Sequence, residues 1–336
     1  MIIVTGGAGF IGSAVVWRLN QKGEKDILIV DHLGETEKWK NLVPLRFSDY
    51  LDRDAFIDRI EKGDFGSRIR AILHLGACSS TTETDAGYLM ENNYRYTLRL
   101  AAWQEQHPNC RFIYASSAAT YGDGAQGHRD DEASLYTLRP LNIYGYSKHL
   151  FDLYALRRGW LHRIAGLKYF NVFGPNEDHK GDMRSVINKA YPEMREYGRI
   201  RLFESYRQDY GDGDQLRDFI YVKDAVEMTL FFLENRRANG LFNLGTGRAR
   251  SWNDVARAMF KALGKEPRIE YIPMPETLRD KYQYYTCADT EKLRAAGCTH
   301  QCMALEDAVS DYLRNYLATG ARLDPGNPVY SSSPGR

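Results

Sequence analysis

Short hydrophobic runs alternate with amphipathic segments along the first half of the chain. The runs that are almost continuously apolar are residues 2–5, 27–31, 71–75, 111–115 and 164–170. Between them, hydrophobic residues recur every three or four positions, as at Ile11, Val15 and Leu19, which is the spacing of a helix that buries one face. Strands that alternate with helices predict right-handed βαβ units, and near-continuous apolar strands fit a parallel sheet covered on both faces. We therefore predict an α/β fold built on a doubly wound parallel Rossmann sheet.

The alternation changes after residue 170. Further helices are predicted over 183–196, 224–233, 251–263 and 304–317, with a strand over 217–222. We assign 1–170 and about 215–240 to the Rossmann domain, and about 171–214 and 241–320 to a smaller α/β substrate-binding lobe. Residues 321–336 contain three prolines and a run of serines, so we predict that they form a disordered tail.

A glycine-rich turn follows the first predicted strand. It reads Gly6-Gly-Ala-Gly-Phe-Ile-Gly12 and leads into the first predicted helix, and Asp31 ends the second strand about 20 residues later. Glycines permit a tight turn and a close approach to a pyrophosphate, while the free N–H groups of the helix N-terminus attract phosphate. This order of strand, turn, helix, strand and acid predicts a dinucleotide site.

Small or polar residues follow other predicted strands in the same way. Gly76–Ser79 follows one strand, and Ser116 and Ser117 follow the next. Because ligands of open α/β sheets bind beyond the carboxyl ends of the strands, these residues should line one crevice with the glycine turn and Asp31. Asn92, in a helix predicted over 88–103, should turn its amide toward the cofactor.

Tyr144 and Lys148 are four positions apart in a predicted helix and therefore lie on the same face. A lysine ammonium near a phenol favours the phenolate and lowers a pKa that is otherwise about 10. Ser117, at a strand end, is placed to hold a substrate hydroxyl beside that phenol. Together with a hydride acceptor in the dinucleotide site, these groups predict an acid/base catalyst that acts on an alcohol oxygen.

Composition excludes several classes of function. The chain has 336 residues and a net charge of +1, so no electrostatic attraction to nucleic acid or to an anionic membrane is expected. No apolar run reaches the roughly 20 residues of a membrane span. The five cysteines are scattered and odd in number, as expected for reduced thiols of a cytoplasmic protein. Cys298 and Cys302 have no second ligand pair at a useful spacing, so no metal site is predicted.

Several motifs together resemble a known family. The glycine turn, Tyr144–Lys148, Asn171–Pro175, Arg217–Val222 and Asn243–Gly247 are similar to motifs of the extended short-chain dehydrogenase/reductase family, and the similarity extends to about residue 318. Within that family, residues 76–83, 114–122, 179–181 and 242–248 resemble the epimerases of ADP-heptoses. The resemblance implies a tightly held NADP and inversion at C6″ of ADP-D-glycero-D-manno-heptose, a lipopolysaccharide precursor, through a transient ketone. It also implies a homo-oligomer, namely a pentamer.

The resemblance also implies roles for individual residues. Tyr144 and Lys180 are the two acid/bases, Lys148 supports Tyr144 and touches the ribose, and Ser117 orients the hydroxyl. The other residues implied to bind the cofactor are Gly6, Gly9, Phe10, Ile11, Gly12, Asp31, His32, Lys38, Arg53, Leu75, Gly76, Ala77, Cys78, Ser79, Asn92 and Val172, with Lys148 and Lys180 again. Those implied to bind the substrate are Ser116, Asn171, Asp182, Lys189, Phe203, Glu204, Ser205, Tyr206, Arg217 and Tyr282.

Chemical reasons support two of these roles. When hydride returns to the opposite face of a ketone, the oxygen lies in a new place, where a second proton donor such as Lys180 is required. A diphosphate favours a bidentate guanidinium such as that of Arg217. The chain departs from the family at Asp182, where serine is frequent, at Lys189, where histidine is usual, and in the acidic loop 209–214.

The choice of cofactor and of reaction leaves alternatives. Asp31 indicates NAD, whereas Lys38 and Arg53 match positions that meet a 2′-phosphate, so we predict NADP with NAD as the alternative. A dehydratase would carry Asp-Glu after the strand-end hydroxyl, where this chain has Ala118-Ala119, which cannot transfer protons. The remaining alternatives are a nucleotide-sugar 4-epimerase and, less favoured because the tyrosine–lysine pair is retained, a non-catalytic NADP-binding sensor.

Overall fold

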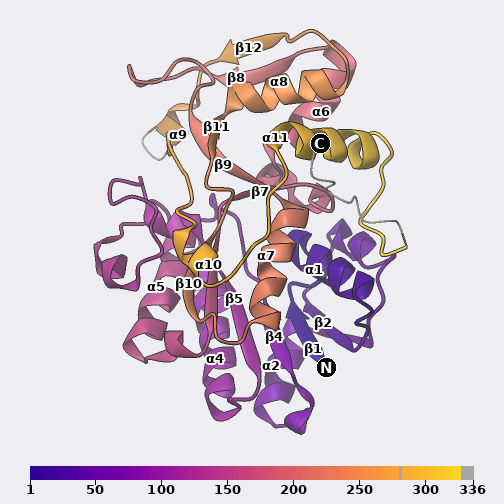
Figure 1. The fold of residues 1–336 in the computed structure, drawn as a ribbon, viewed down its shortest axis with the longest axis vertical. Helices are drawn as coiled ribbons and strands as arrows, with labels where there is room; N and C mark the ends of the chain where they lie inside the picture. Colours follow the sequence, from indigo (N-terminus) through magenta and orange to yellow (C-terminus); the bar gives the residue numbers. More distant parts are fainter. Residues whose placement is uncertain (280–281, 327–336) are drawn as a thin grey trace.

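The computed structural model describes residues 1–279 and 282–326, and its centre is a seven-stranded sheet in the order β10-β6-β5-β4-β1-β2-β3 (Figure 1). The strands are β1 (Ile2–Thr5), β2 (Ile27–Asp31), β3 (Asp49–Asp52), β4 (Ala71–His74), β5 (Arg111–Ser117), β6 (Ala165–Tyr169) and β10 (Gly240–Leu244). Every pair of neighbours is parallel. The strand order reverses between β1 and β4, so the predicted doubly wound Rossmann sheet is confirmed.

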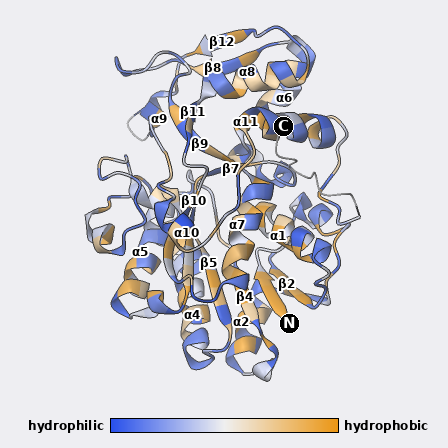
Figure 2. Cartoon of the chain, viewed as in Figure 1, coloured by the Kyte–Doolittle hydropathy of each residue, from blue (hydrophilic) through white to orange (hydrophobic). Residues whose placement is uncertain are grey.

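Helices cover both faces of this sheet. On one face α1 (Phe10–Gln21) packs against α7 (Val222–Glu234), and on the other lie α2 (Arg53–Glu61), α4 (Tyr96–Gln106) and α5 (Ile143–Arg157). Side chains of a strand alternate between the two layers, so Ile2 and Val4 join the first core and Ile3 the second. Figure 2 shows hydrophobic residues along the central strands, as expected for a sheet covered on both sides.

The remaining strands and most of the remaining α-helices build a smaller lobe beyond the carboxyl ends of the central strands (Figure 1), whereas residues 86–89 pack against α5 and residues 291–295 against β10. A three-stranded sheet joins β7 (Asn171–Phe173), β9 (Leu216–Tyr221) and β11 (Ala249–Ser251), and a two-stranded sheet joins β8 (Ile200–Phe203) and β12 (Ile269–Ile272). The further α-helices are α3 (Ala86–Leu89), α6 (Val186–Tyr197), α8 (Trp252–Ala262), α9 (Glu276–Arg279), α10 (Glu291–Ala295) and α11 (Leu305–Asp311).

Short helical turns connect these elements. They are η1 (Glu37–Asn41), η2 (Gly66–Arg68), η3 (Met90–Arg95), η4 (Ala118–Tyr121), η5 (Glu132–Thr137), η6 (Trp160–His162), η7 (Asp178–Met183) and η8 (Tyr312–Leu317). Within residues 1–279 and 282–326, no helix combines the length and the apolar character that crossing a membrane requires.

Two predicted domain boundaries are wrong. Residues 241–244 belong to β10, which pairs with β6 at the edge of the central sheet, although they were assigned to the lobe. Conversely, β9 pairs with β7 and β11 rather than with the central sheet, although α7 directly after it packs on that sheet. The chain thus crosses between the two parts more often than local patterns indicate, and the other boundaries stay predictions.

The predicted disordered tail is wrong for residues 321–326. Leu323 is completely buried, and the indole Nε1 of Trp17 in α1 donates to the carbonyl of Asp324 at 3.1 Å. The buried side chain of Leu323 and the hydrogen bond from Trp17 therefore anchor this polar, proline-containing segment. The rest of the predicted tail, 327–336, lies outside the described residues.

Candidate active site

A cavity of about 770 Å³ lies where the carboxyl ends of the central strands face the lobe. It brings together residues that are up to 249 positions apart in the sequence, from Gly6 to Val255. The predicted site residues that line it are Gly6, Gly9, Phe10, Ile11, Gly12, Asp31, Lys38, Leu75, Gly76, Ala77, Cys78, Ser79, Ser116, Ser117, Tyr144, Lys148, Asn171, Val172 and Lys180. The crevice expected from the strand ends is therefore a single continuous site.

A smaller cavity of about 130 Å³ adjoins the first one at the end of β2. Asp31 and Lys38 line both cavities, and the predicted residues His32, Arg53 and Asn92 line the smaller one. The guanidinium of Arg53 donates to the side-chain oxygen of Asn92. This corner of the cleft therefore contains two cations beside the acid that ends β2.

The glycine turn fits a pyrophosphate because its backbone is closely packed and the first turn of the helix that follows it has no side-chain cap among the described residues. Gly6 has φ +67°, and a Cβ at residue 12 would lie 2.0 Å from the carbonyl oxygen of Gly6. Helix α1 follows Gly9, and no side chain of the described residues caps its first turn. Its N-terminal N–H groups therefore remain available to an anionic ligand.

The carboxylate of Asp31 is already engaged by the chain itself. It accepts hydrogen bonds from the backbone of Ala8 at 2.9 Å and His32 at 2.8 Å, and from the ammonium of Lys38 at 2.7 Å. The charge of this acid is therefore paired, and both oxygens have donors. Asp31 consequently braces the glycine turn, whereas the sequence predicts a contact to a ribose hydroxyl.

Helix α5 presents Tyr144 beside the end of β5. Asn142 caps the helix by accepting from the N–H of Gly145 at 2.8 Å. Burial raises the pKa of Tyr144, and hydrogen bonding with Ser117 lowers it in part. The phenol therefore favours its protonated form and adjoins the serine predicted to orient the substrate.

Lys148 differs from its predicted arrangement. Its Nζ donates to the carbonyl of Ala115 in β5 at 2.8 Å, and burial lowers the pKa of Lys148 to about 8. The prediction that this ammonium lowers the pKa of Tyr144 is wrong. The reason is that burial disfavours the phenolate while the lysine is bonded to the strand.

Lys180 faces the same cavity from the turn η7. Its ammonium lies 5.3 Å from the ring centroid of Phe10, next to the glycine turn. Burial lowers the pKa of Lys180, and the nearby Glu177 opposes that shift. The cavity thus holds a protonated phenol and a lysine that loses its proton more easily than an exposed one.

Ser116 and eight other predicted residues do not contribute to the cavity as expected. The hydroxyl of Ser116 donates to the buried carboxylate of Asp152 at 2.7 Å, so it points into the interior. The residues that do not line the cavity are Asp182, Lys189, Phe203, Glu204, Ser205, Tyr206, Arg217 and Tyr282. For these eight residues, a role in binding the substrate stays a prediction.

Arg217 and Tyr282 nevertheless adjoin the cavity through Trp252, which lines it. The guanidinium of Arg217 lies 5.0 Å from the ring centroid of Tyr282 and 5.9 Å from that of Trp252. Arg217 is 6% exposed, and no carboxylate of the described residues pairs with it. Its guanidinium donates to the carbonyl of Leu216 at 2.9 Å, and a buried guanidinium that lies against aromatic rings without a carboxylate partner is suited to an anionic group of a ligand.

The sequence did not identify Asn93 as the asparagine that organises the cleft. Its amide accepts from the N–H of Cys78 at 2.9 Å and donates to the carbonyl of Cys78 and the hydroxyl of Ser147, each at 3.0 Å. It therefore joins the turn after β4 to helix α5. The predicted residue was its neighbour Asn92; the π-helical turn η3, which contains both, changes which residues face the sheet.

His179, Phe219 and Trp252 also line the cavity without having been predicted as site residues. Burial, together with the nearby cations Lys38 and Lys180, lowers the pKa of His179 to about 4. The only signal for His179 in the sequence is its place beside Lys180. Nothing local distinguishes Trp252, which is the first residue of α8.

One group of potential metal ligands occurs in the described residues, away from this cavity. Donor atoms of Asp224, His300 and Cys302 lie within 4.8 Å of one another. The carboxylate of Asp224 is already bonded to His300 Nε2 at 2.8 Å and to the N–H of Met303 at 3.1 Å, and burial raises the pKa of Cys302 to about 12. The thiol is therefore protonated, and the carboxylate already has two partners. We assign this group a structural role, in which it links residues 300–303 to α7.

Comparison with known proteins agrees with this arrangement. Residues 2–245 match the model of the NAD dependent epimerase/dehydratase family. A protein of Nitratidesulfovibrio vulgaris strain DP4 named ADP-L-glycero-D-manno-heptose-6-epimerase is 58% identical over 318 residues, which cover 95% of this chain and 98% of that protein.

Solved structures show the same similarity in three dimensions. The ADP-L-glycero-D-manno-heptose-6-epimerase of Helicobacter pylori superposes with a TM-score of 0.78 at 27% identity, over 94% of this chain and 95% of that one. The UDP-glucose 4-epimerase of Thermus thermophilus, solved with NAD, superposes with a TM-score of 0.75 at 27% identity, over 94% of this chain and 99% of that one.

Proposed function

The chain belongs to the NAD dependent epimerase/dehydratase family, and from this premise we propose that it inverts C6″ of ADP-D-glycero-D-manno-heptose to give the L-glycero form. The observation that carries the proposal is that one cavity contains the glycine turn, Tyr144 and Lys180. Inversion through a ketone needs one proton-transfer group for each position of the oxygen, and these two side chains supply them. The name shared by relatives in two organisms agrees with this substrate.

The residues around the glycine turn fit a nicotinamide dinucleotide. Free N–H groups of α1 and the closely packed glycines would hold the pyrophosphate, and Lys148 would meet the ribose. When bound, the nicotinamide supplies the acceptor and donor of hydride for the alcohol carbon. The protein itself must therefore hold the sugar, exclude water and move protons.

We assign complementary protonation states to Tyr144 and Lys180. The pKa of Lys180 is lowered and that of Tyr144 is raised, so in one direction the lysine accepts the hydroxyl proton and the phenol donates a proton to the ketone oxygen. The reverse direction exchanges the two roles. Ser117 would hold the hydroxyl beside Tyr144, and Arg217, next to Trp252, would meet the diphosphate.

We further propose NADP as the cofactor. Lys38 pairs with Asp31, which removes the negative charge that would repel a 2′-phosphate, and Arg53 lies in the adjoining cavity. Two cations and a paired carboxylate suit a phosphate better than a ribose hydroxyl. NAD is the alternative, as in the similar Thermus thermophilus structure.

The proposal extends to the assembly of the protein and to its location in the cell. We propose a homo-oligomer, a pentamer in accordance with the sequence resemblance, and a cytoplasmic enzyme that acts before the heptose enters lipopolysaccharide. The free thiols of its five cysteines agree with a reducing compartment.

The decisive experiment offers the protein a choice of substrates. We expect ADP-D-glycero-D-manno-heptose to be converted to the L-glycero form, which proton NMR resolves, and UDP-glucose to remain unchanged. In deuterated water the hydrogen on C6″ should be retained, because hydride leaves and returns on one cofactor. Deuterium at C6″ would contradict the redox route, and conversion of UDP-glucose instead would favour the 4-epimerase alternative.

A further inference from the structure

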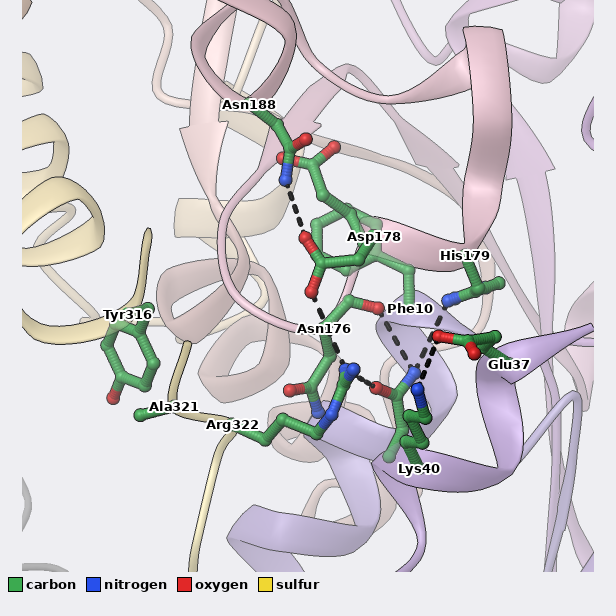
Figure 3. Close-up of polar contacts among 12 residues, drawn as sticks. Phe10, Glu37, Lys40, Asn176, Asp178, His179, Asn188, Tyr316, Ala321 and Arg322 are labelled. Carbon is green, nitrogen blue, oxygen red and sulfur yellow. Dashed lines mark hydrogen bonds and ion pairs between the residues drawn. The ribbon is translucent and has the colours of Figure 1, made fainter. Parts of the chain in front are cut away.

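The segment that follows the last helix returns to the cleft. Residues 321–324, which we call the C-terminal strap, contact the polar residues behind η7 and η1 (Figure 3). Leu323 anchors the strap because its side chain is completely buried, and its N–H donates to the side-chain oxygen of Asn176 at 3.2 Å. The strap is therefore fixed directly after Arg322, since Asp324 is also bonded to Trp17.

Arg322 joins two loops that are distant in the sequence. Its Nη1 donates to the side-chain oxygen of Asn41 at 2.6 Å and lies 3.6 Å from a carboxylate oxygen of Asp178. Figure 3 shows its side chain pointing toward Asp178, whose other oxygen accepts from Asn188 at 2.9 Å. One guanidinium thus contacts the end of η1 and the start of η7.

Asn41 is the residue through which this contact acts. It is completely buried, and its amide nitrogen donates to the carbonyls of Ala8 at 3.0 Å and Asn176 at 3.1 Å and lies 3.4 Å from His179 Nδ1. Among the described residues, Arg322 alone donates to its side-chain oxygen. Removing Arg322 would leave a buried acceptor unsatisfied, and the amide would have to move.

The loops that meet at Asn41 also line the cleft. Ala8 belongs to the glycine turn, η1 contains Lys38, and η7 contains Lys180. We propose that Arg322 is a positioning residue that holds these three loops together, so that the C-terminal strap sets both the affinity for the cofactor and the placement of Lys180. The effect on Lys180 rests on the proposed function, whereas the effect on cofactor affinity does not.

The arrangement has a consequence for proton transfer. Lys180 is kept partly dry by its position against Phe10, and burial lowers its pKa. If η7 loosens, water reaches the ammonium and the pKa of Lys180 rises toward that of an exposed lysine. A loss of Arg322 should therefore change the pH dependence of the reaction as well as its rate.

The first test measures cofactor binding by the full chain after its cofactor has been removed. Arg322→Ala should weaken NADP binding about tenfold, as expected when a charged hydrogen bond that braces a site is lost. Arg314→Ala is the matched control, because Arg314 also makes a hydrogen bond through its guanidinium, to the carbonyl of Ala262, but lies on η8 and does not line the cavity. Arg314→Ala should bind NADP like the wild type, and Arg322→Lys should recover part of the affinity.

The second test uses the pH dependence of epimerisation at saturating NADP. The part of the pH–rate profile that reports the titration of Lys180 should shift to higher pH in Arg322→Ala. It should stay in place in Arg314→Ala. Arg322→Gln, which keeps a donor for Asn41 but loses the charge, provides a second variant if the alanine variant does not fold. NADP affinity within about twofold of the wild type in Arg322→Ala, or in Arg322→Gln if the alanine variant does not fold, would overturn the proposal.

The two tests separate the inference from the proposed function. If the wild type does not act on the ADP-heptose but Arg322→Gln still binds NADP more weakly, the function is wrong and the role of the strap in cofactor binding stands. If the wild type is an epimerase and neither affinity nor pH profile responds to Arg322, the function stands and the strap has no positioning role.

Discussion

Tyr144 and Tyr146 are two residues apart on α5 but have different surroundings. Tyr144 lines the cavity beside Ser117, whereas Tyr146 is 45% exposed. We expect Tyr144→Phe to lower kcat by about 10²–10⁴-fold, since it removes one proton-transfer group and little volume. NADP affinity should stay unchanged because the glycine turn is untouched. Tyr146→Phe is the control, and equal turnover of the two variants would refute the role of Tyr144.

His74 shows how a single buried residue sets the pH range of stability. Its Nδ1 lies 2.7 Å from the hydroxyl of Thr5 and its Nε2 2.8 Å from that of Thr97. Thr97 donates to the carbonyl of Asn93, so it accepts from the imidazole, which assigns the neutral form with a proton on Nε2. Burial lowers the pKa of His74 to about 3.

The sign of the resulting pH effect follows from this depressed pKa. Below about pH 6.5 His74 becomes protonated in the unfolded chain but stays neutral in the folded chain. The contribution of His74 to the free energy of unfolding should therefore be fully present above that pH. As the pH falls toward 3, the free energy of unfolding should decrease by on the order of 1 kcal/mol per pH unit. In urea titrations, His74→Gln should reduce this slope, whereas His162→Gln, an exposed control, should not. An unchanged slope in His74→Gln would contradict the assignment.

At the scale of elements, one buried ion pair joins β5, β6 and α5. Lys168 donates to the carboxylate of Asp152 at 2.7 Å, and neither residue is exposed to solvent. Tyr114 and Ser116 donate to the same carboxylate, which therefore fixes α5 against the strand that ends at Ser117. Helix α5, which presents Tyr144, is thus held by charge as well as by apolar packing.

Breaking this pair should destabilise the fold strongly. Asp152→Asn leaves the ammonium of Lys168 without a counter-charge in the core, and such a change typically costs about 3–5 kcal/mol of unfolding free energy. The double variant Asp152→Asn/Lys168→Met should be closer to the wild type, because no buried charge remains unpaired. Glu234→Gln, in the exposed pair with Lys22, is the control with little expected effect. A double variant no better than Asp152→Asn would contradict this account.

The same elements show what the sequence could and could not predict. The glycine turn, Asp31 and Ser117 follow from local patterns, because parallel strands bring their carboxyl ends to one edge. Asn93 could not be chosen over Asn92, since a π-helical turn changes the face that each presents. The pKa of Tyr144 was predicted in the wrong direction, because spacing alone does not reveal that Lys148 bonds to Ala115.

At the scale of the whole molecule, long-range contacts limit such predictions. Arg322 and Asn41 are 281 positions apart, and nothing in the polar segment around Arg322 indicates that it returns to the cleft. Arg217 and Trp252 likewise meet only when β9 and β11 pair. The sheet could be predicted because each of its strands has a recognisable run of hydrophobic residues. The contacts that join the two parts of the molecule have no such local pattern.

Because the cleft lies between the central sheet and the lobe, a bound cofactor should stabilise the whole molecule. A ligand at about 100 times its dissociation constant adds about 2.7 kcal/mol to the free energy of unfolding. After removal of the cofactor, NADP should therefore raise the melting temperature more than NAD does at equal concentration. Arg53→Ala should narrow that difference, since Arg53 lines the corner next to Asp31 and Lys38. Arg59→Ala, on the same helix but paired with Asp64, should not. A larger shift with NAD would reverse our assignment of the cofactor and leave the fold and the two acid/base groups as argued.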